Sequence, residues 1–418
     1  MLGRRLVLPL LLPVALLAGC GAAADEPDRR APQHVVLTPT ADPARSTTLT
    51  WRSSAPARDQ RVVVTGPSGS RRVDAVSKGV VRQRFSGTDV PAFTTTVDGL
   101  EPGTTYRYRI GSGDAAARGT FRTADADLGA AWSFLSLGDT QVDNAGVPRD
   151  IVRRAVREHP DARLLLHAGD VVDDPTEGSQ WDALFGALAP ARSLPLLVSI
   201  GNHEQCKLMR CRDGDAQAFT DSFTFPDNGF AHQRPTWFRT DYQGVRFVVL
   251  DPFGPDLARQ ARFLEASLER NPMRWTVVLM HQGPFASRAD RSSTNVFYDL
   301  WPIMKRHRVD LVLTGHDHSY DRGYQGDPDG PVVLTSNSGP KEYPPSDLDW
   351  KRRGATRVVW AKHVSTYQVV DVSRDRLRVR AVVGFVGERA VPRDAAVGQV
   401  LDDVTIDRGT DGRNRVTW

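Results

Sequence analysis

Potential metal ligands stand directly after five apolar runs of the chain. The set contains carboxylate and amide oxygens and imidazole nitrogens, and these ligand types suit hard or borderline ions such as iron, manganese and zinc. A carboxylate has two oxygens and can bridge two ions, so the set predicts a centre for two metal ions. The candidate ligands are Asp139, Asp170, Asn202, His281, His316 and His318.

The apolar runs before these residues are predicted to be strands. Continuous apolar runs suit strands buried on both faces, and amphipathic helical patterns at 151–156 and 257–268 lie between them. In open α/β sheets, ligands gather beyond the carboxyl ends of the strands, so residues far apart in sequence would meet at one edge. Residues 386–418 have no clear pattern and stay unassigned. The predicted strands are 131–137, 164–168, 196–200, 245–250, 275–280, 311–314, 332–336, 368–372 and 377–383.

Residues 34–123 have the pattern of an all-β domain. Short runs of Val, Thr, Trp and Tyr alternate with Pro, Gly and Ser, which leaves no room for a long helix. The stretch from Leu100 to Tyr106, Leu-Glu-Pro-Gly-Thr-Thr-Tyr, resembles the corner of fibronectin type III domains, where a tyrosine hydroxyl binds nearby backbone. The region has no cluster of acids, bases or metal ligands, so a structural role is expected for it. A polar linker at 124–130 follows.

The ligand blocks, taken in order, resemble the signature of the calcineurin-like metallophosphoesterase superfamily. The closer resemblance is to the purple acid phosphatases, whose patterns Gly-Asn-His-Glu, Val-Leu-Met-His and Gly-His-x-His-x-Tyr-x-Arg stand at 201–204, 278–281 and 315–322. The likeness covers most of residues 34–385. It implies a fibronectin III-like β-sandwich followed, at 131–385, by an α/β metallophosphoesterase domain with two stacked sheets flanked by helices.

The resemblance also implies a reaction. Hydroxide formed on two metal ions, Fe, Mn or Zn, would attack a small phosphate ester, with monoesters favoured over diesters. His203 would lie near the leaving oxygen as proton donor or transition-state stabiliser. Carried over position by position, Asp139 and His318 would hold the first metal, Asn202, His281 and His316 the second, and Asp170 would bridge them.

Two positions depart from the purple acid phosphatase pattern. Asp173 stands three residues after the bridging Asp, where those enzymes have the tyrosine that binds ferric ion, so no tyrosinate-to-iron colour is expected. A carboxylate is shorter than a phenol, which favours a place behind the ligands or at the surface for Asp173. Gln141 stands where the superfamily has His or Gly, and its amide oxygen either reaches the first metal or only forms hydrogen bonds nearby. His167 is interpreted as a strand residue that can support the site from behind.

Further residues of the blocks leave alternatives open. Tyr320 and Arg322 match the family pattern and are candidate substrate contacts, although Arg322 can instead form a salt bridge at the rim of the site. Glu204 is expected to be structural or to support the ligands. Residues 205–236 follow the Asn-His block directly. They either shape access to the substrate or pack as an ordinary insertion.

The N-terminus has the pattern of an export signal. Two arginines precede an apolar run at 6–18 that is too short, and too interrupted by proline, to span a bilayer of about 30 Å. Leu-Ala-Gly-Cys at 17–20 resembles a bacterial lipobox, which implies cleavage before Cys20 and lipidation of its thiol. The alternative is cleavage within 21–24 and a secreted protein. The prediction is a signal peptide at 1–19, a lipid-anchored tether at 20–33, and a place on the extracytoplasmic face of the membrane.

Export makes a disulfide between Cys206 and Cys211 the expected state of these residues, since an exported chain meets an oxidising compartment. The other interpretation, metal binding, is weak because the pair offers two ligands where zinc usually takes four.

Charge and composition argue against some classes of function. The chain of 418 residues has a formal net charge of +4, and loss of Arg4 and Arg5 with the signal peptide lowers it to +2. A nearly neutral protein without a basic patch interleaved with aromatics does not favour a nuclease or another nucleic-acid partner. A non-catalytic surface lipoprotein is the alternative from another class. The complete ligand set argues against it, because an inert domain would be expected to lose some of these residues.

Overall fold

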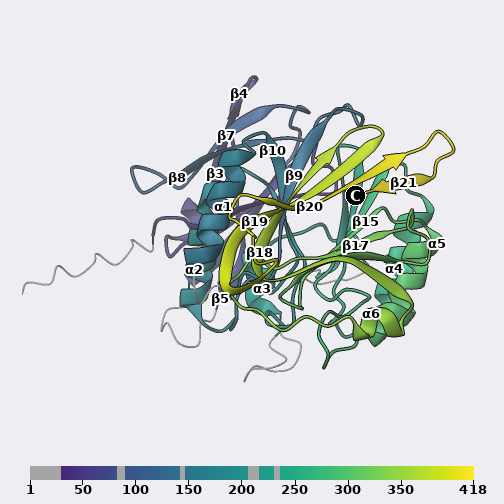
Figure 1. Ribbon diagram of the computed structural model, residues 1–418. Helices are drawn as coiled ribbons and strands as arrows, with labels where there is room; N and C mark the ends of the chain where they lie inside the picture. Colours follow the sequence, from purple (N-terminus) through teal and green to yellow (C-terminus); the bar gives the residue numbers. More distant parts are fainter. Residues whose placement is uncertain (1–29, 82–89, 142–145, 206–215, 230–235) are drawn as a thin grey trace, which may run out of the picture.

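The computed structural model describes residues 30–81, 90–141, 146–205, 216–229 and 236–418. Within these ranges the chain forms an all-β domain followed by an α/β domain, which confirms the predicted fold class (Figure 1). No helix in the described ranges combines the length and apolar character needed to cross a lipid bilayer. The predicted signal peptide, the lipidation site at Cys20 and the disulfide between Cys206 and Cys211 lie outside the described residues.

Two four-stranded antiparallel sheets form the front domain and pack face to face. Large side chains, among them Trp51, Phe93 and Tyr108, are less than a tenth exposed and fill the space between the sheets. A single turn of 3-10 helix, η1 (Ala57–Asp59), follows β2. The strand orders are β1 (Gln33–Pro39), β2 (Thr47–Arg52), β6 (Val90–Val97), β5 (Val76–Val81) in one sheet and β4 (Gly69–Asp74), β3 (Arg61–Gly66), β7 (Thr105–Ile110), β8 (Ala117–Arg122) in the other.

The predicted tyrosine corner is present in the front domain. The backbone N–H of Glu101 donates to the Tyr106 hydroxyl at 2.8 Å, just where β7 begins. Gly103 has a φ of 61°, a left-handed conformation that costs glycine little. The sequence therefore specifies this turn through Gly103, which allows the left-handed backbone, and Tyr106, which binds the backbone of Glu101.

The strands of the α/β domain form one continuous 13-stranded sheet that turns at β18 (Ala355–Val372). Residues 355–361 of β18 pair with β16, whereas residues 362–372 pair with β9 and β19. We call the two parts the first and second half-sheets. The first has the order β11 (Leu196–Val198), β10 (Ala162–His167), β9 (Trp132–Leu137), β18, β19 (Arg376–Val391), β20 (Val400–Arg408), β21 (Asn414–Thr417). The second has the order β12 (Phe238–Tyr242), β13 (Val245–Val249), β14 (Trp275–Leu279), β15 (Leu311–Thr314), β17 (Val332–Thr335), β16 (Tyr320–Gln325), β18.

The half-sheets stack on each other. Aromatic rings meet between them: the ring of Phe134 on β9 lies 5.5 Å from that of Phe247 on β13, and Trp132 lies 4.9 Å from Tyr242. Val248, next to Phe247, points the other way into a separate core that helices close. Strands buried on both faces explain the continuous apolar runs.

Helices cover both outer faces of this stack. Figure 1 shows α1 and α2 on one side of it and α4, α5 and α6 on the other. The short α3 contacts β5 of the front domain. The helices are α1 (Gly146–Glu158), α2 (Gly178–Leu188), η2 (Ala189–Ala191), α3 (Gln217–Ser222), α4 (Leu257–Glu269), η3 (Val296–Leu300), α5 (Trp301–Arg306) and α6 (Leu348–Arg352).

The C-terminal residues left unassigned by sequence extend the first half-sheet. β19 continues to Val391, and β20 and β21 add two antiparallel strands beyond it. The predicted strands at 368–372 and 377–383 are only parts of β18 and β19. Partly exposed residues in the remaining parts, such as 356–360, broke the apolar pattern and made the predicted strands too short.

Candidate metal centre

The candidate ligands lie at one edge of the domain. β9, β10 and β11 are parallel, as are β14, β15 and β17, so their carboxyl ends share an edge within each half-sheet. All the candidate ligands follow such ends, and each is at most 9% exposed. The loops after β9, β10, β11, β14 and β15 carry Asp139, Asp170, Asn202, His281, and His316 with His318, respectively.

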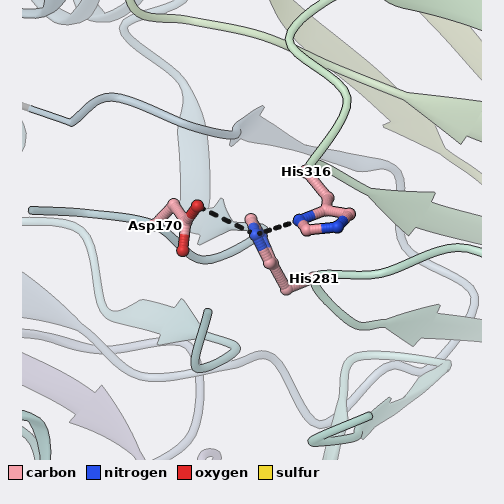
Figure 2. Close-up of side chains that lie close together, drawn as sticks. All are labelled: Asp170, His281 and His316. Atoms are coloured by element: carbon pink, nitrogen blue, oxygen red, sulfur yellow. Dashed lines mark hydrogen bonds and ion pairs between the residues drawn. The ribbon is translucent and has the colours of Figure 1, made fainter. Parts of the chain in front are cut away.

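Two groups of side chains share Asp170. Ligand atoms of Asp170, His281 and His316 lie within 4.8 Å of one another, and so do those of Asp139, Asp170 and His318. Figure 2 shows His281 between the carboxylate of Asp170 and the ring of His316. The His281 Nε2 atom is 3.1 Å from Asp170 Oδ2 and 3.3 Å from His316 Nδ1. The structure thus brings together residues that are far apart in sequence around one shared carboxylate.

Backbone carbonyls set the orientation of two imidazoles. The Nδ1–H of His281 donates to Ala168 O at 2.7 Å, and that of His318 donates to Lys341 O at 2.9 Å. Each ring therefore turns Nε2 toward a carboxylate, and His318 Nε2 lies 3.4 Å from Asp139 Oδ1. A neutral imidazole there presents a lone pair to a carboxylate oxygen, an arrangement that a cation between the two atoms would stabilise.

Burial and charge determine the protonation states of the group. Burial lowers the pKa of His318 to about 3, so this ring is neutral and free to bind a cation at neutral pH. Burial also raises the pKa of Asp139 well above its usual range. For His281 burial acts downward, but the carboxylates of Asp170 and Asp139 outweigh it and raise the pKa to about 9. Without a metal ion, the proton on His281 supplies the positive charge that balances the carboxylates. A bound ion would take over this role.

Two amide oxygens lack partners at the same place. Among the described residues, Asn202 Oδ1 and Gln141 Oε1 are buried without a hydrogen-bond partner. Buried polar atoms are rarely left unpaired, and an ion bound here would satisfy the Asn202 oxygen. The donor set of oxygens and imidazole nitrogens, the facing acceptors and the unpaired amide all fit two metal ions.

The loops that hold the ligands are strained. Four of the ligands have positive φ: Asp139 at 48°, Asp170 at 50°, His316 at 77° and His318 at 52°. Such conformations persist only where packing enforces them, and they gather at functional sites. Glycines before several ligands also leave room for neighbouring side chains, and Gly169 before Asp170 has a φ of 85° itself. A Cβ on Gly315 would overlap the carboxylate of Asp139, and one on Gly201 would overlap that of Asp170.

His203 lies beside the shared carboxylate and is slightly exposed. Its backbone N–H donates to Asp170 Oδ1 at 3.1 Å, and its ring Nδ1–H donates to Asp173 O at 2.6 Å. Its Nε2 atom is 3.7 Å from Asp170 Oδ2, and the side chain is 11% exposed. The carbonyl of Asp173 thus orients the ring of His203 so that Nε2 lies on the side of the shared carboxylate.

Three candidates for support of the ligands also reach this centre. Gln141 Nε2 donates to Asp170 Oδ2 at 3.2 Å, so its contact is with the shared carboxylate. Asp173 Oδ1 pairs with Lys341 Nζ at 3.1 Å, and its side chain is partly exposed. The same oxygen lies 3.6 Å from Nδ1 of His203, on the side of the ring away from Nε2. His167 Nε2 bonds to Thr140 Oγ1 at 3.0 Å and steadies the loop after β9.

The candidate substrate contacts Tyr320 and Arg322 instead lie in a buried network. Both side chains are 1% exposed. The Tyr320 hydroxyl donates to Asp402 Oδ2 at 2.7 Å, and Arg322 pairs with the same carboxylate at 2.5 Å. Their donors are used within the protein, so we assign them a structural role. Of the two alternatives that the sequence left open for Arg322, the structure has an ion pair, and it is buried rather than at a rim.

The sequence analysis expected Glu204 to be structural or to support the ligands, but it missed Arg291 and Tyr343 near the centre. The carboxylate of Glu204 accepts the backbone N–H groups of Asp170, Gly201 and Val172. Arg291 donates to His316 O and to Asp317 Oδ1, and the Tyr343 ring lies 4.6 Å from that of His318. The sequence held one sign of the position of Tyr343. The predicted strand at 332–336 ends at the same sheet edge as the ligand strands, so the loop after it reaches the centre. That strand is not followed by a ligand-type residue, and the loop was therefore not considered.

Comparison with known proteins decides the family. Residues 133–320 match the family "Calcineurin-like phosphoesterase". Residues 32–123 match the family "Purple acid Phosphatase, N-terminal domain". The chain carries a calcineurin-like phosphoesterase domain behind a purple acid phosphatase N-terminal domain. This confirms the resemblance read from the motif blocks.

Several relatives of this chain are phosphatases. Human acid phosphatase type 7 is 28% identical over 82% of this chain and 88% of the relative. Phosphoenolpyruvate phosphatase from Allium cepa is 27% identical over 55% of this chain and 50% of the relative. A purple acid phosphatase from yellow lupin seeds has a similar fold, with a TM-score of 0.70 at 18% identity, covering 92% of this chain and 75% of that chain.

Proposed function

We propose that this protein hydrolyses phosphate esters, with monoesters preferred, at a centre for two metal ions. The observation that carries the proposal is the pair of buried ligand groups that share Asp170. Asp139 and His318 would hold one ion, and Asn202, His281 and His316 the other. The likeness to acid phosphatases supports the same reaction class. Fe, Mn and Zn all suit these ligands, and Asp173 stands where the coloured enzymes have a tyrosine, so we expect no tyrosinate-to-iron colour.

The side chains around the centre suggest how the reaction proceeds. Bound ions would neutralise charge on the phosphate and lower the pKa of water, which provides the nucleophile. Asp170 is held by Gln141 and by the backbone of His203, so its two oxygens keep fixed directions. The carbonyl of Asp173 holds the Nδ1–H of His203, so Nε2 is the atom that would pass a proton to the leaving oxygen.

The place of action is part of the proposal. The export pattern before residue 34 supports an extracytoplasmic enzyme, held by a lipid on Cys20 or released as a soluble protein. Mass spectrometry of the mature protein from a bacterial host would measure the N-terminal residue and any acyl chains. An N-terminus within 21–24 without lipid would favour the secreted form.

The function is tested with para-nitrophenyl phosphate beside its bis-ester, using residues 34–418 loaded with Mn, Zn or Fe. We expect faster hydrolysis of the monoester. His203→Ala should lower kcat by about 100-fold, the size typical of a lost proton donor, while metal content stays constant. The control is His307→Ala, a half-buried histidine at the end of α5 that pairs with Glu265, and it should leave kcat unchanged.

The same assay separates the alternatives. Faster turnover of the bis-ester would reassign the protein as a phosphodiesterase. A folded, metal-loaded sample that turns over neither ester would favour the non-catalytic binding protein.

A further inference from the structure

A basic groove of about 500 Å³ lies at the edge of the domain opposite the metal centre. Arg308 and Val309 precede β15 and Pro331 precedes β17, whereas His316 follows the other end of β15. The end of β20 and β21 complete the walls, and Figure 1 shows α5 and β21 on the same side of the molecule. The volume is within the range of small-molecule sites.

Positive charge dominates the walls of this groove. Its lining has five cationic side chains against two carboxylates, Asp327 and Asp329. Both carboxylates are engaged by backbone: Asp327 Oδ1 accepts from Asp329 N, and Asp329 Oδ1 accepts from Val416 N. The cationic residues are Lys305, Arg308, Arg408, Arg413 and Arg415.

Several of these cations lack a carboxylate partner. Within the described part of the chain, the side chains of Arg308 and Arg413 form no hydrogen bond or ion pair. Lys305 Nζ donates only to the neutral amide of Gln325, at 2.8 Å. Arg415 approaches Asp411 at 3.5 Å, and both side chains are exposed to water, which weakens the attraction. Unpaired guanidinium groups that converge on a concavity attract anions.

The inner wall of the groove is rigid. Arg408 pairs with the buried Asp310 at 2.5 Å, donates to Arg274 O at 3.2 Å, and lies over the ring of Trp275. Asn414 donates to the same Asp310 oxygen at 2.8 Å. Groups fixed before binding lose little conformational entropy when a ligand arrives. The groove thus combines a preformed wall with exposed cations around it.

We propose that this groove binds a small soluble anion with several negative charges, carried by phosphate or carboxylate groups. Guanidinium forks match both groups, often with two parallel hydrogen bonds. A concave groove lined by cations from residues 305–308 and 408–415 fits a compact anion. The site is separate from the metal centre and does not depend on the phosphatase activity proposed above.

The test is isothermal titration calorimetry on residues 34–418, with tripolyphosphate in one arm and citrate in the other. Samples as purified and after metal removal are titrated in parallel. We expect a site that keeps its affinity after metal removal, apart from binding at the metal centre itself, and that is weakened by added salt. Arg308→Glu combined with Arg413→Glu should weaken binding at least about 100-fold, about 10-fold for each lost contact.

A matched control carries the same charge change elsewhere. Arg352→Glu combined with Arg393→Glu alters two exposed arginines outside the groove and should bind as the parent does. Circular dichroism and thermal unfolding check that both double variants fold. Three results would overturn the proposal: no binding of either anion at about 1 mM, unchanged affinity in the groove variant, or binding that disappears with the metals. Preference for one anion identifies the group recognised.

Discussion

Individual residues that bind no metal orient the ligands. Glu204 is fully buried, and its two oxygens accept three backbone N–H groups from the loops after β10 and β11. These loops carry Asp170 and Asn202, so one carboxylate sets the distance between ligands from neighbouring strands. Loss of such a supporting group typically lowers metal affinity by about 10- to 100-fold.

Exchanging Glu204 for glutamine tests this role. Glu204→Gln keeps the shape but replaces one acceptor oxygen by an NH2 group, which leaves at least one buried N–H without a partner at a cost of about 1–3 kcal/mol. We expect metal affinity to fall by about 10-fold or more. Metal titration followed by elemental analysis measures it. Parent-like affinity in Glu204→Gln would show that the carboxylate is dispensable.

A second buried carboxylate, Glu342, makes stability depend on pH. Its side chain is 5% exposed and lies 2.5 Å from His363 Nδ1, and burial raises its pKa to about 7 from an ordinary value of 4.5. Between these values the folded protein binds more protons than the unfolded chain, so this group's contribution to stability falls as pH rises and is lost above pH 7.

Glu342→Gln should remove this dependence. The variant is expected to exceed the parent in unfolding free energy by about 1–3 kcal/mol at pH 8, and to lose the advantage near pH 4.5. Urea unfolding across this range measures the difference. An equal slope with pH in both proteins would contradict the assignment.

Among the elements, α3 connects the metal domain to the front domain. Lys78 on β5 donates from Nζ to Phe223 O at 2.7 Å, to Thr224 Oγ1 at 2.7 Å and to Thr220 O. Arg52 on β2 adds a bond to Ser222 Oγ at 3.0 Å. The front domain thus holds residues 220–224, a part of the segment 205–236 that follows the Asn202-His203 block.

Lys78→Met should weaken this junction. It keeps an apolar stem but removes an ammonium with three acceptors, so we expect a loss of about 2–3 kcal/mol in unfolding free energy. Metal content should not change, because no candidate ligand contacts Lys78. Lys351→Met is the control, since its side chain is 70% exposed and its ion pair with Asp347 contributes little. Equal losses in the two variants would argue against a specific junction.

For the whole molecule, the metal centre joins the two half-sheets. Asp139, Asp170 and Asn202 come from the first, and His281, His316 and His318 come from the second. Ions bound between them would hold the half-sheets together, and a group that binds only the folded state stabilises it by mass action.

Metal removal should therefore lower thermal stability. Ions present at about 100 times their Kd contribute about 2.7 kcal/mol, which corresponds to a Tm lower by about 5 °C after chelation. Scanning calorimetry with and without chelator measures the change. Asp170→Asn, which alters the shared carboxylate, should show a much smaller difference. If the Tm of the parent stays the same after metal loss has been confirmed, the bound ions do not stabilise the fold.

The sequence by itself determined the fold class, the order of strands along the chain and the residue types at the strand ends. These follow from local pattern: continuous apolar runs require burial on both faces, and the Leu100–Tyr106 corner has a fixed geometry. The motif blocks were sufficient to name Asp139, Asp170 and His281 as residues that come together. The separation of these residues in sequence does not say how far apart they lie in space. Their common position after parallel strands does, because the carboxyl ends of such strands share one sheet edge.

Only the tertiary structure decided which side chains face which. Tyr320 and Arg322 fit a motif for substrate contact, yet Asp402 on β20, a strand with no clear pattern, engages both within the fold. Lys341 reaches His318 through its backbone carbonyl, an atom that every residue has and no motif can specify. The basic groove likewise gathers cations from α5 and from β20 and β21, which are remote in sequence. Long-range pairing of this kind depends on packing, because burial and charge compensation are properties of the folded chain.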